Sequence, residues 1–224
     1  MKRDPLPATV LSTRYIPNAT PKMVQDLITA GGIIEYDPKR HRSLALLTVD
    51  CDDVTYTALD EATKKADVDV IYARSFYGGA ANANTKLAGE ILGVLAGPNP
   101  AEARAGLEAA VDFIQNEAHF VSANEDDTIP YYAHCISRTG SYLSSTNGIQ
   151  EGEALAYLIA PPLEAMYAID AAVKAADVEI VALYNPPSET NFGGGLLTGT
   201  QSACKAACNA FAEAVEAVAA NPLV

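Results

Sequence analysis

An internal repeat constrains the fold of this chain more than any other feature of its sequence. The segment 154–181, ALAYLIAPPLEAMYAIDAAVKAADVEIV, resembles the earlier segment 44–71, LALLTVDCDDVTYTALDEATKKADVDVI. A shift of 110 residues, which is 170 minus 60, places Asp60 opposite Asp170 and Lys64 opposite Lys174. Each copy contains an apolar strand pattern, an amphipathic helix pattern and a second strand pattern. A repeat of this density predicts two structurally similar units.

The repeat continues at a different offset towards the end of each half. Gly97 corresponds to Gly199, a shift of 199 minus 97 or 102, and AGPNPAEARAGLEAAVDF lies over TGTQSACKAACNAFAEAV. The alternating strands and helices predict an α/β sheet with helices packed on it. We expect strands near 9–16, 44–49, 68–73, 88–96 and 131–138, helices near 54–66, 101–115 and 201–219, and an acidic linker at 116–130.

The charge and composition exclude some classes of function. The formal net charge is −13 and the pI is near 4.5, which argues against nucleic-acid binding, because that requires a basic surface. An acidic chain suits cationic small molecules, but the same charge also serves solubility. We find no signal peptide and no apolar run near the roughly 20 residues of a membrane span. We therefore expect a soluble, intracellular protein.

The residue types that carry most enzyme chemistry are sparse or scattered. None of the four cysteines forms a CxxC motif, and we expect them to pack as small buried side chains in a reduced protein. Only three histidines are available, which predicts no metal site. No GxSxG motif accompanies the serines near His134. The sequence therefore predicts no catalytic residue, no metal and no cofactor.

Three aspartates at the end of the strand near 44–49 are the most informative polar feature. Asp50, Asp52 and Asp53 follow this strand, whereas the second copy has Ala160, Pro161 and Pro162 at its strand end. Asp52 or Asp53 could cap the following helix, but a cap needs only one carboxylate. Two interpretations stay open at this point, a helix-start cluster and a site for a cation or amine.

Two long glycine-rich segments are expected as loops, at 75–86 (SFYGGAANANTK) and at 185–195 (NPPSETNFGGG). The first lacks the GK[ST] ending of a phosphate-binding loop, and the second lacks the GxGxxG spacing of a dinucleotide-binding turn. Loops of this length in compact domains are commonly functional.

Several long motifs resemble one family. RTGSYLSSTNGI, ADVDVIYARSFYGGAA, AGPNPAEARAGLEAA, LIAPPLEAMYAIDAA, PPSETNF and LTGTQSACKAACNAF are similar to the tandem-domain bacterial microcompartment shell proteins, specifically the L-type shell proteins of ethanolamine utilisation. The resemblance extends from about residue 8 to the end. It implies an α+β, ferredoxin-like fold of two tandem, circularly permuted shell domains, at 1–122 and 123–224.

The resemblance also implies a function without catalysis. Three chains would form a flat homotrimeric pseudohexamer that associates with other shell proteins, in the shell of a microcompartment in the cytoplasm. Three small pores would bind ethanolamine, and a gated central pore would pass metabolites or cofactors. The implied small-pore residues are Asp52, Asp53, Glu90 and Phe120, with Tyr77 as a neighbour. The implied gate residues are Phe76, Tyr77, Gly78, Gly79, Asn191, Phe192, Gly193 and Gly194.

Two rival classes of function remain. A soluble metabolite-binding regulator with no shell role would also explain acidic residues that occur in only one copy. A lyase or transferase of the same pathway is disfavoured, because the sequence offers no nucleophile, metal cluster or cofactor loop.

Overall fold

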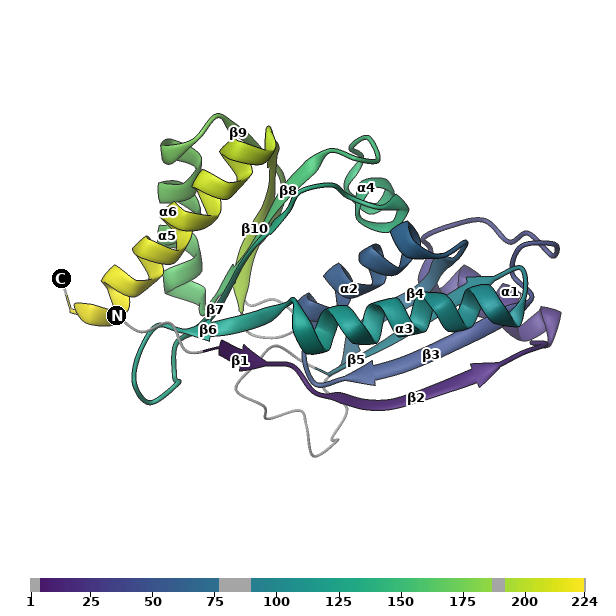
Figure 1. Cartoon of the computed structure of the whole chain (residues 1–224). Helices are drawn as coiled ribbons and strands as arrows, with labels where there is room; N and C mark the ends of the chain where they lie inside the picture. Colours follow the sequence, from purple (N-terminus) through teal and green to yellow (C-terminus); the bar gives the residue numbers. More distant parts are fainter. Residues whose placement is uncertain (1–4, 77–89, 187–191, 224) are drawn as a thin grey trace.

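The computed structural model describes residues 5–76, 90–186 and 192–223, which form two antiparallel sheets with helices packed on them (Figure 1). The first sheet has the strand order β2-β3-β5-β4. Its elements are β2 (Val10–Ile16), α1 (Pro21–Gly31), β3 (Ser43–Val49), α2 (Asp52–Lys65), β4 (Asp69–Phe76), β5 (Glu90–Gly97) and α3 (Pro100–Asn116).

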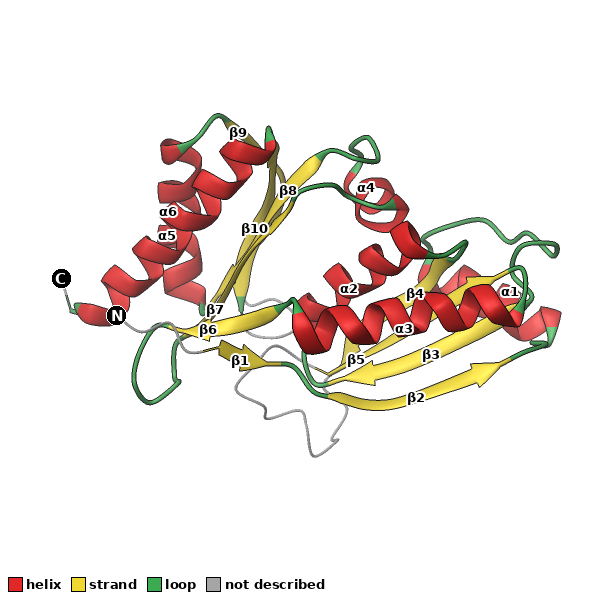
Figure 2. Ribbon diagram, in the orientation of Figure 1, coloured by secondary structure: helices red, strands yellow, loops and turns green. Residues whose placement is uncertain are grey.

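The second sheet has six strands in the order β1-β6-β7-β8-β10-β9. Figure 2 shows α5 and α6 on its outer face. Its elements are β1 (Pro5–Pro7), β6 (His119–Ser122), β7 (Pro130–Ile136), α4 (Ser141–Asn147), β8 (Ala154–Ala160), α5 (Pro162–Ala175), β9 (Val178–Tyr184), β10 (Gly193–Gly199) and α6 (Gln201–Ala220). Every described strand pair is antiparallel, which makes α+β the accurate form of the predicted class.

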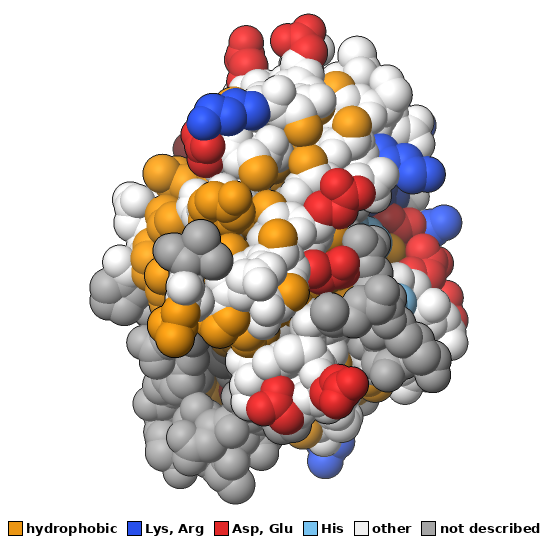
Figure 3. Space-filling view, turned by 90° about the vertical axis from the view of Figure 1, so that its left-hand side faces the viewer, with side chains coloured by type: hydrophobic (Ala, Val, Ile, Leu, Met, Phe, Trp, Pro, Cys, Tyr) orange, Lys and Arg blue, Asp and Glu red, His pale blue; other side chains and the backbone are white. Residues whose placement is uncertain are grey.

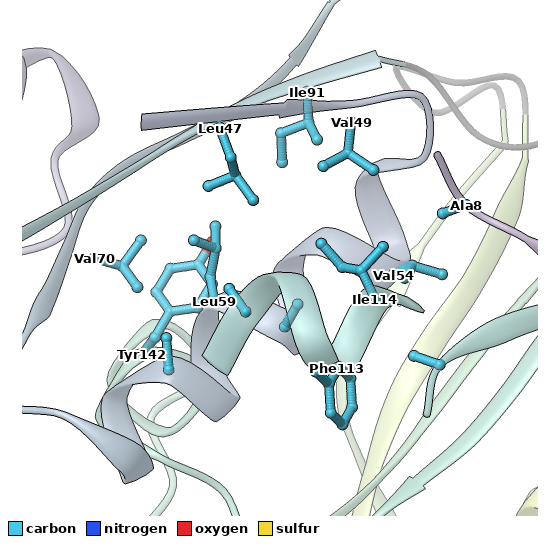
Figure 4. Close-up of a cluster of buried hydrophobic side chains, with 14 of the residues drawn as sticks. Ala8, Leu47, Val49, Val54, Leu59, Val70, Ile91, Phe113, Ile114 and Tyr142 are labelled. Atoms are coloured by element: carbon cyan, nitrogen blue, oxygen red, sulfur yellow. The ribbon is translucent and has the colours of Figure 1, made fainter. Parts of the chain in front are cut away.

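The central strands are covered on both faces, as their continuous apolar runs predict. In β3, Ala45 and Leu47 face α2 and α3, whereas Leu44 packs with Val24 and Ile28 of α1. Figure 4 shows the larger of these clusters, in which side chains of the sheet meet those of α2 and α3. Burial of these apolar side chains is the main source of stability for such a layered fold.

The second sheet buries one face against its own helices and the other against the first half. Alternate residues of β8, such as Ala156 and Leu158, pack with α5 and α6. The residues between them, including Leu155 and Ile159, join the core cluster that contains α2. All seven residues of β8 are buried because the strand lies between α5 and α6 on one side and the first half on the other, which explains why it has no polar face.

A buried carboxylate fixes the second half to the first. Asp60 of α2 accepts hydrogen bonds from the backbone N–H groups of Gly140 (2.7 Å) and Leu143 (2.8 Å), at the start of α4. The Lys64 ammonium donates to the Arg138 carbonyl at 2.9 Å. A β-carbon at Gly140 would lie 2.2 Å from Oγ1 of Thr63, so the close contact requires glycine.

Regular structure occurs in one segment expected as a linker, in one expected as a loop, and in a third for which no element is predicted. The predicted linker 116–130 includes β6, which pairs with β1 and β7. The expected loop 185–195 is wrong at its end, because β10 begins at Gly193. The segment 139–152 contains the short helix α4. Because β1 and β6 belong to the six-stranded sheet, strands from both sides of the predicted 122/123 boundary share one sheet, and that boundary stays a prediction.

Close strand approach explains the glycines of β10. Gly194 has φ = 154°, and a β-carbon there would lie 1.9 Å from the Leu158 carbonyl oxygen. Only glycine adopts this conformation without strain and leaves room for β8. The glycine run therefore forms a strand where its composition predicts a loop.

Candidate ligand-binding site

A cavity of about 760 Å³ lies between the two halves of the chain. Elements α2 and β4 of the first half form one wall, and α4, β8, β9 and β10 of the second half form the other. The lining residues are Asp52, Asp53, Tyr56, Ala73, Tyr142, Leu143, Thr146, Asn147, Tyr157, Ile159, Ala182, Leu183, Tyr184, Asn185, Phe192 and Gly193.

The start of α2 places two carboxyl groups in this cavity. Cys51 is the N-cap residue, so Asp52 and Asp53 occupy the first two helical positions, and the predicted capping role of either aspartate is wrong. Both are buried, with 4% and 6% exposure. A carboxylate in the first helical turn interacts favourably with the positive end of the helix dipole. The helix start therefore supports negative charge here but does not require two carboxylates.

Asp50 has a different role from its two neighbours. Its Oδ1 atom accepts a hydrogen bond from the Thr9 backbone N–H at 2.6 Å, outside the cavity lining. Of the three aspartates that distinguish the first copy, Asp50 binds the backbone of the segment before β2, and the other two line the cavity.

Hydrogen bonds from several elements hold the two carboxyl groups. The Ser75 hydroxyl of β4 donates to Oδ2 of Asp52 at 2.7 Å, and the Asp53 backbone N–H donates to Oδ1 of Asp52 at 2.9 Å. The Tyr157 hydroxyl of β8 donates to Oδ1 of Asp53 at 2.9 Å. The site is thus assembled from residues of both halves and exists only in the folded chain.

Burial shifts the protonation of this pair. Desolvation raises the pKa of Asp52 to about 6, although the hydrogen bond from Ser75 opposes the shift. Desolvation, and next the charge of Asp52, raise the pKa of Asp53 well above its usual range. Two adjacent buried carboxylates disfavour simultaneous ionisation.

The other described lining residues include several aromatic side chains and none with a positive charge. Tyr56, Tyr142, Tyr157 and Tyr184 contribute rings and hydroxyl groups, and the described lining residues include no Lys, Arg or His. Carboxylates beside aromatic rings provide both charge-assisted acceptors and cation–π faces. The arrangement therefore suits a small organic cation.

Two other predicted small-pore residues lie near this cavity without lining it. Glu90 begins β5 opposite Phe76, it is buried, and within the described part of the chain its Oε2 atom has no hydrogen-bond partner. Phe120 is fully buried, stacks on Tyr132 at 5.3 Å and meets the lining residue Phe192 edge-on at 6.2 Å. Phe120 thus supports the wall of the cavity.

The predicted gate residues are only partly within the described residues. Phe76 is the last residue of β4, Phe192 precedes β10, and Gly193 and Gly194 lie within β10. Tyr77, Gly78, Gly79 and Asn191 lie outside the described residues.

Five groups at the cavity were not predicted from the sequence, namely those of Tyr56, Tyr142, Tyr157, Tyr184 and Ser75. Tyr157 lies in an apolar strand pattern, and its contact with Asp53 spans 104 residues of sequence. Tyr142 and Tyr184 likewise reach the site only through the packing of the two halves, whereas Ser75 contacts Asp52 within the first half. A tyrosine in an otherwise aliphatic run was the one available signal, because a buried hydroxyl generally needs a partner.

The cysteines are free, and most of them are buried. The four cysteines are free thiols; Cys51, Cys204 and Cys208 are buried as predicted, and Cys135 is half-buried. Among the described residues no group of three or more potential ligands could hold a metal ion. None of the described helices is both long and apolar enough to span a membrane.

Comparisons with known proteins agree with the fold and the repeat. The BMC domain family matches residues 43–130 and 160–223. The bacterial microcompartment shell protein EutL of Clostridium perfringens is 66% identical over 223 residues, covering 100% of this chain and 99% of the relative. EutL of Salmonella typhimurium is 58% identical over 186 residues, covering 83% and 85% of the two chains.

Solved structures give the same result. The ethanolamine utilization protein EutL from Leptotrichia buccalis superposes with a TM-score of 0.90 at 70% identity, covering 100% of both chains. The trimeric shell protein PduB has a TM-score of 0.70 at 20% identity, covering 90% of this chain and 85% of that one, which shows a shared fold.

The repeated α+β unit and these matches define the class: the chain belongs to the BMC-domain family of bacterial microcompartment shell proteins. Within that family it is similar to EutL over its whole length. It is therefore a structural shell protein that associates with other shell proteins, not an enzyme and not a regulator without a shell role. The predicted family and the predicted location in a microcompartment shell are confirmed.

Proposed function

We propose that this shell protein forms a homotrimer in which each chain binds ethanolamine between its halves and contributes to a gated central pore. The observation that carries the ligand assignment is the pair of buried carboxyl groups, Asp52 and Asp53, in a cavity lined in part by tyrosines and, among the described residues, by no basic side chain. The family supplies the chemical class, since a relative at 70% identity is an ethanolamine utilization protein.

The physical fit concerns the ammonium group of the ligand. An alkylammonium ion presents hydrogen-bond donors and one positive charge, which carboxylates accept in charge-assisted hydrogen bonds. The four tyrosines offer hydroxyl groups for the alcohol end of ethanolamine and rings for its short carbon chain. Negative charge without a cationic partner in the lining is the condition under which such a ligand gains most from binding.

The exposure of equivalent surfaces supports the trimer. Asp53, Thr57 and Val70 of the first half are buried, with exposures of 6%, 2% and 2%, and the first two contact Tyr157 and Tyr132 of the second half. Their counterparts at a shift of 110 are Leu163, Tyr167 and Ile180, with exposures of 67%, 59% and 47%. Large apolar side chains exposed together on one surface are typical of an interaction site.

A ring of three chains would cover that surface. If the second half of one chain meets the first half of the next as the halves meet within a chain, six similar units close around one axis. Figure 3 views the side of the molecule on which α5 and α6 lie, where hydrophobic side chains gather along one flank. We infer that the α5–β9 surface packs against a neighbouring chain.

The central pore follows from the same symmetry. The connection between β4 and β5 corresponds to the connection between β9 and β10, so a trimer would present six such segments around its axis. We propose that the gate is formed by residues of these connections and of the strand ends beside them, namely Phe76, Tyr77, Gly78, Gly79, Asn191, Phe192, Gly193 and Gly194. A ligand in the cavity can bias this gate only by binding one state more tightly than the other.

Isothermal titration calorimetry with ethanolamine tests the ligand assignment. We expect the double variant Asp52→Asn, Asp53→Asn to lose measurable binding, because amides supply no charge for the ammonium group. Asp50→Asn is the matched control, since it removes a nearby carboxylate that lies outside the cavity lining. Unchanged binding in the double variant would reject the site.

Sedimentation velocity tests the trimer. The double variant Tyr167→Glu, Ile180→Glu introduces charge on the exposed surface, and we expect it to sediment as a single chain where the unmodified protein sediments as a trimer. Lys22→Glu, on an exposed part of α1, is a control for added negative charge. The proposal would be contradicted if the unmodified protein sediments as a single chain at all concentrations.

A further inference from the structure

We propose that the empty cavity keeps one proton on the Asp52–Asp53 pair and releases it when an alkylammonium ion binds, so that the site exchanges a proton for an organic cation. This inference rests on the proposed ligand class and adds a regulation of the same site by pH. In the bound state the positive charge of the cation takes the place of the proton in offsetting the negative charge of the two buried carboxyl groups.

The geometry disfavours two negative charges on the pair. The two residues are consecutive in the chain, both are buried, and one is hydrogen-bonded to the backbone N–H of the other. The hydroxyl groups of Ser75 and Tyr157 also donate to the pair, and all of these donors are neutral. Two ionised carboxylates this close repel each other in a buried site, and one proton held by the pair removes that repulsion.

Among the described residues, the groups around the pair supply no positive charge. The elements packed against it contribute Tyr56 from α2, Tyr142 from α4, Tyr157 from β8 and Tyr184 from β9, all as phenols. Burial raises the pKa of each of these tyrosines, so they stay neutral at physiological pH. Burial likewise raises the pKa of the adjacent Cys51 thiol. Within the described part of the chain, the charge of the pair is therefore left for a proton or a bound cation to neutralise.

A further acidic residue strengthens the same conclusion. Glu90 of β5 lies across from Phe76, next to the strand residue Ser75 that contacts Asp52. It adds potential negative charge near the cavity and no compensating positive charge. The Asp60 carboxylate, two turns along α2, is paired with α4 and does not line the cavity.

The titration of the pair falls in the range where the ligand keeps its own charge. Burial places the pKa of Asp52 at about 6 and that of Asp53 well above its usual range. An aliphatic amine has a pKa near 10 in water, so ethanolamine stays protonated over the same range. Raising the pH therefore removes the competing proton but not the charge of the ligand, and binding strengthens. Below the pKa of the pair the affinity changes by up to about tenfold per pH unit.

The proton balance is simple. The empty site is one carboxyl and one carboxylate, the bound site is two carboxylates and one ammonium ion, and the released proton passes to the buffer. The net charge of the cavity changes by zero, which avoids the cost of placing a second charge in a buried site.

Isothermal titration calorimetry of the full chain with ethanolamine hydrochloride measures the released proton directly. Titrations at one pH in phosphate and in HEPES buffers, which differ in ionisation enthalpy and contain no primary ammonium group, should give different apparent enthalpies. We expect release of up to one proton for each bound ligand, and affinity that weakens by up to about tenfold per unit of acidification.

Two variants separate the pair from the other carboxylates. Asp53→Asn keeps an acceptor for Tyr157 but leaves a single carboxyl group in the cavity. We expect this variant to bind ethanolamine more weakly, and its apparent binding enthalpy at pH 7 to lose most of its dependence on the buffer. Asp50→Asn should retain the dependence of the binding enthalpy on the buffer. Binding whose enthalpy is the same in both buffers at every pH would overturn the exchange and leave the ligand assignment intact. Absence of ethanolamine binding at any pH would overturn the proposed function and the exchange with it.

Discussion

Asp60 and Asp170 occupy equivalent positions in the two halves but have opposite surroundings. Asp60 is fully buried and holds the start of α4 through two backbone N–H groups. Asp170 is exposed and forms an ion pair with Lys174 one helical turn away. The residues are the same, so the difference comes from the neighbour that each half meets. The second half covers the first within the chain, whereas the corresponding surface of the second half is left open.

The first turn of each helix differs between the two halves in its sequence as well as in its surroundings. In the register of the two helices, Asp52 corresponds to Pro162 and Asp53 to Leu163. The first half therefore places carboxyl groups in a cavity, and the second half places an apolar side chain on the surface. Duplication within one chain allows the two copies to diverge in this way, which identical subunits of a hexamer cannot do.

The largest expected effect concerns the equivalent aspartates. Asp60→Ala leaves two buried N–H groups without their acceptor, and we expect a loss of about 2–5 kcal/mol in the free energy of unfolding. Asp170→Ala removes only an exposed ion pair and should cost less than about 0.5 kcal/mol. Urea unfolding at equal protein concentration measures both. Equal losses in the two variants would show that the halves do not differ as described.

A smaller effect concerns the pH dependence of stability. The folded pKa of Asp52 lies above its unfolded value near 4, so its protonated form stabilises the fold below about pH 4. That stabilisation is lost as the pH rises through about 6. We expect the ligand-free protein to lose about 1–3 kcal/mol between pH 4 and 7 relative to the Asp52→Asn, Asp53→Asn variant.

Chemical denaturation at several pH values checks this prediction. The titrating pair occurs only in the first half, so substitutions at the second-half counterparts Pro162 and Leu163 should not change the pH dependence. Parallel curves for the unmodified protein and the double variant would contradict the raised pKa of the pair.

The smallest expected effect concerns the hydroxyl group that links the halves at the cavity. Tyr157→Phe removes the donor to Asp53, and we expect a loss of about 1–2 kcal/mol at neutral pH. Tyr36→Phe, whose ring lies beside His41 outside the cavity, should change stability by less than about 0.5 kcal/mol. A Tyr157→Phe protein as stable as the Tyr36→Phe protein would indicate that this hydrogen bond has no net value.

Local patterns in the sequence predict most of the fold. The repeat and the apolar strands follow from residues close together in the chain, and the structure confirms them. The glycines of β10 were expected in a loop because glycine favours loops, but close contact with Leu158 requires them in a strand. Helix α4 and strand β6 are short and polar, so their formation depends on contacts with Asp60 and with β1 and β7.

The candidate site is predictable only in part. Comparing the copies identifies Asp52 and Asp53, because two carboxylates exceed what a helix start needs. Tyr157 corresponds to Leu47 in the first copy, and nothing near it in sequence indicates a partner at Asp53. The cavity itself arises from the packing of one half on the other, and patterns within each half carry no information on that packing.

The stoichiometry of ethanolamine binding tests the difference between the halves most directly. Equilibrium dialysis at pH 8, at protein concentrations where the assembly is complete, counts the ligands bound to each chain. One ligand per chain is the predicted result, because the first-half carboxyl groups have no counterpart in the second half. Two ligands per chain would contradict the divergence of the copies, and none would contradict the site.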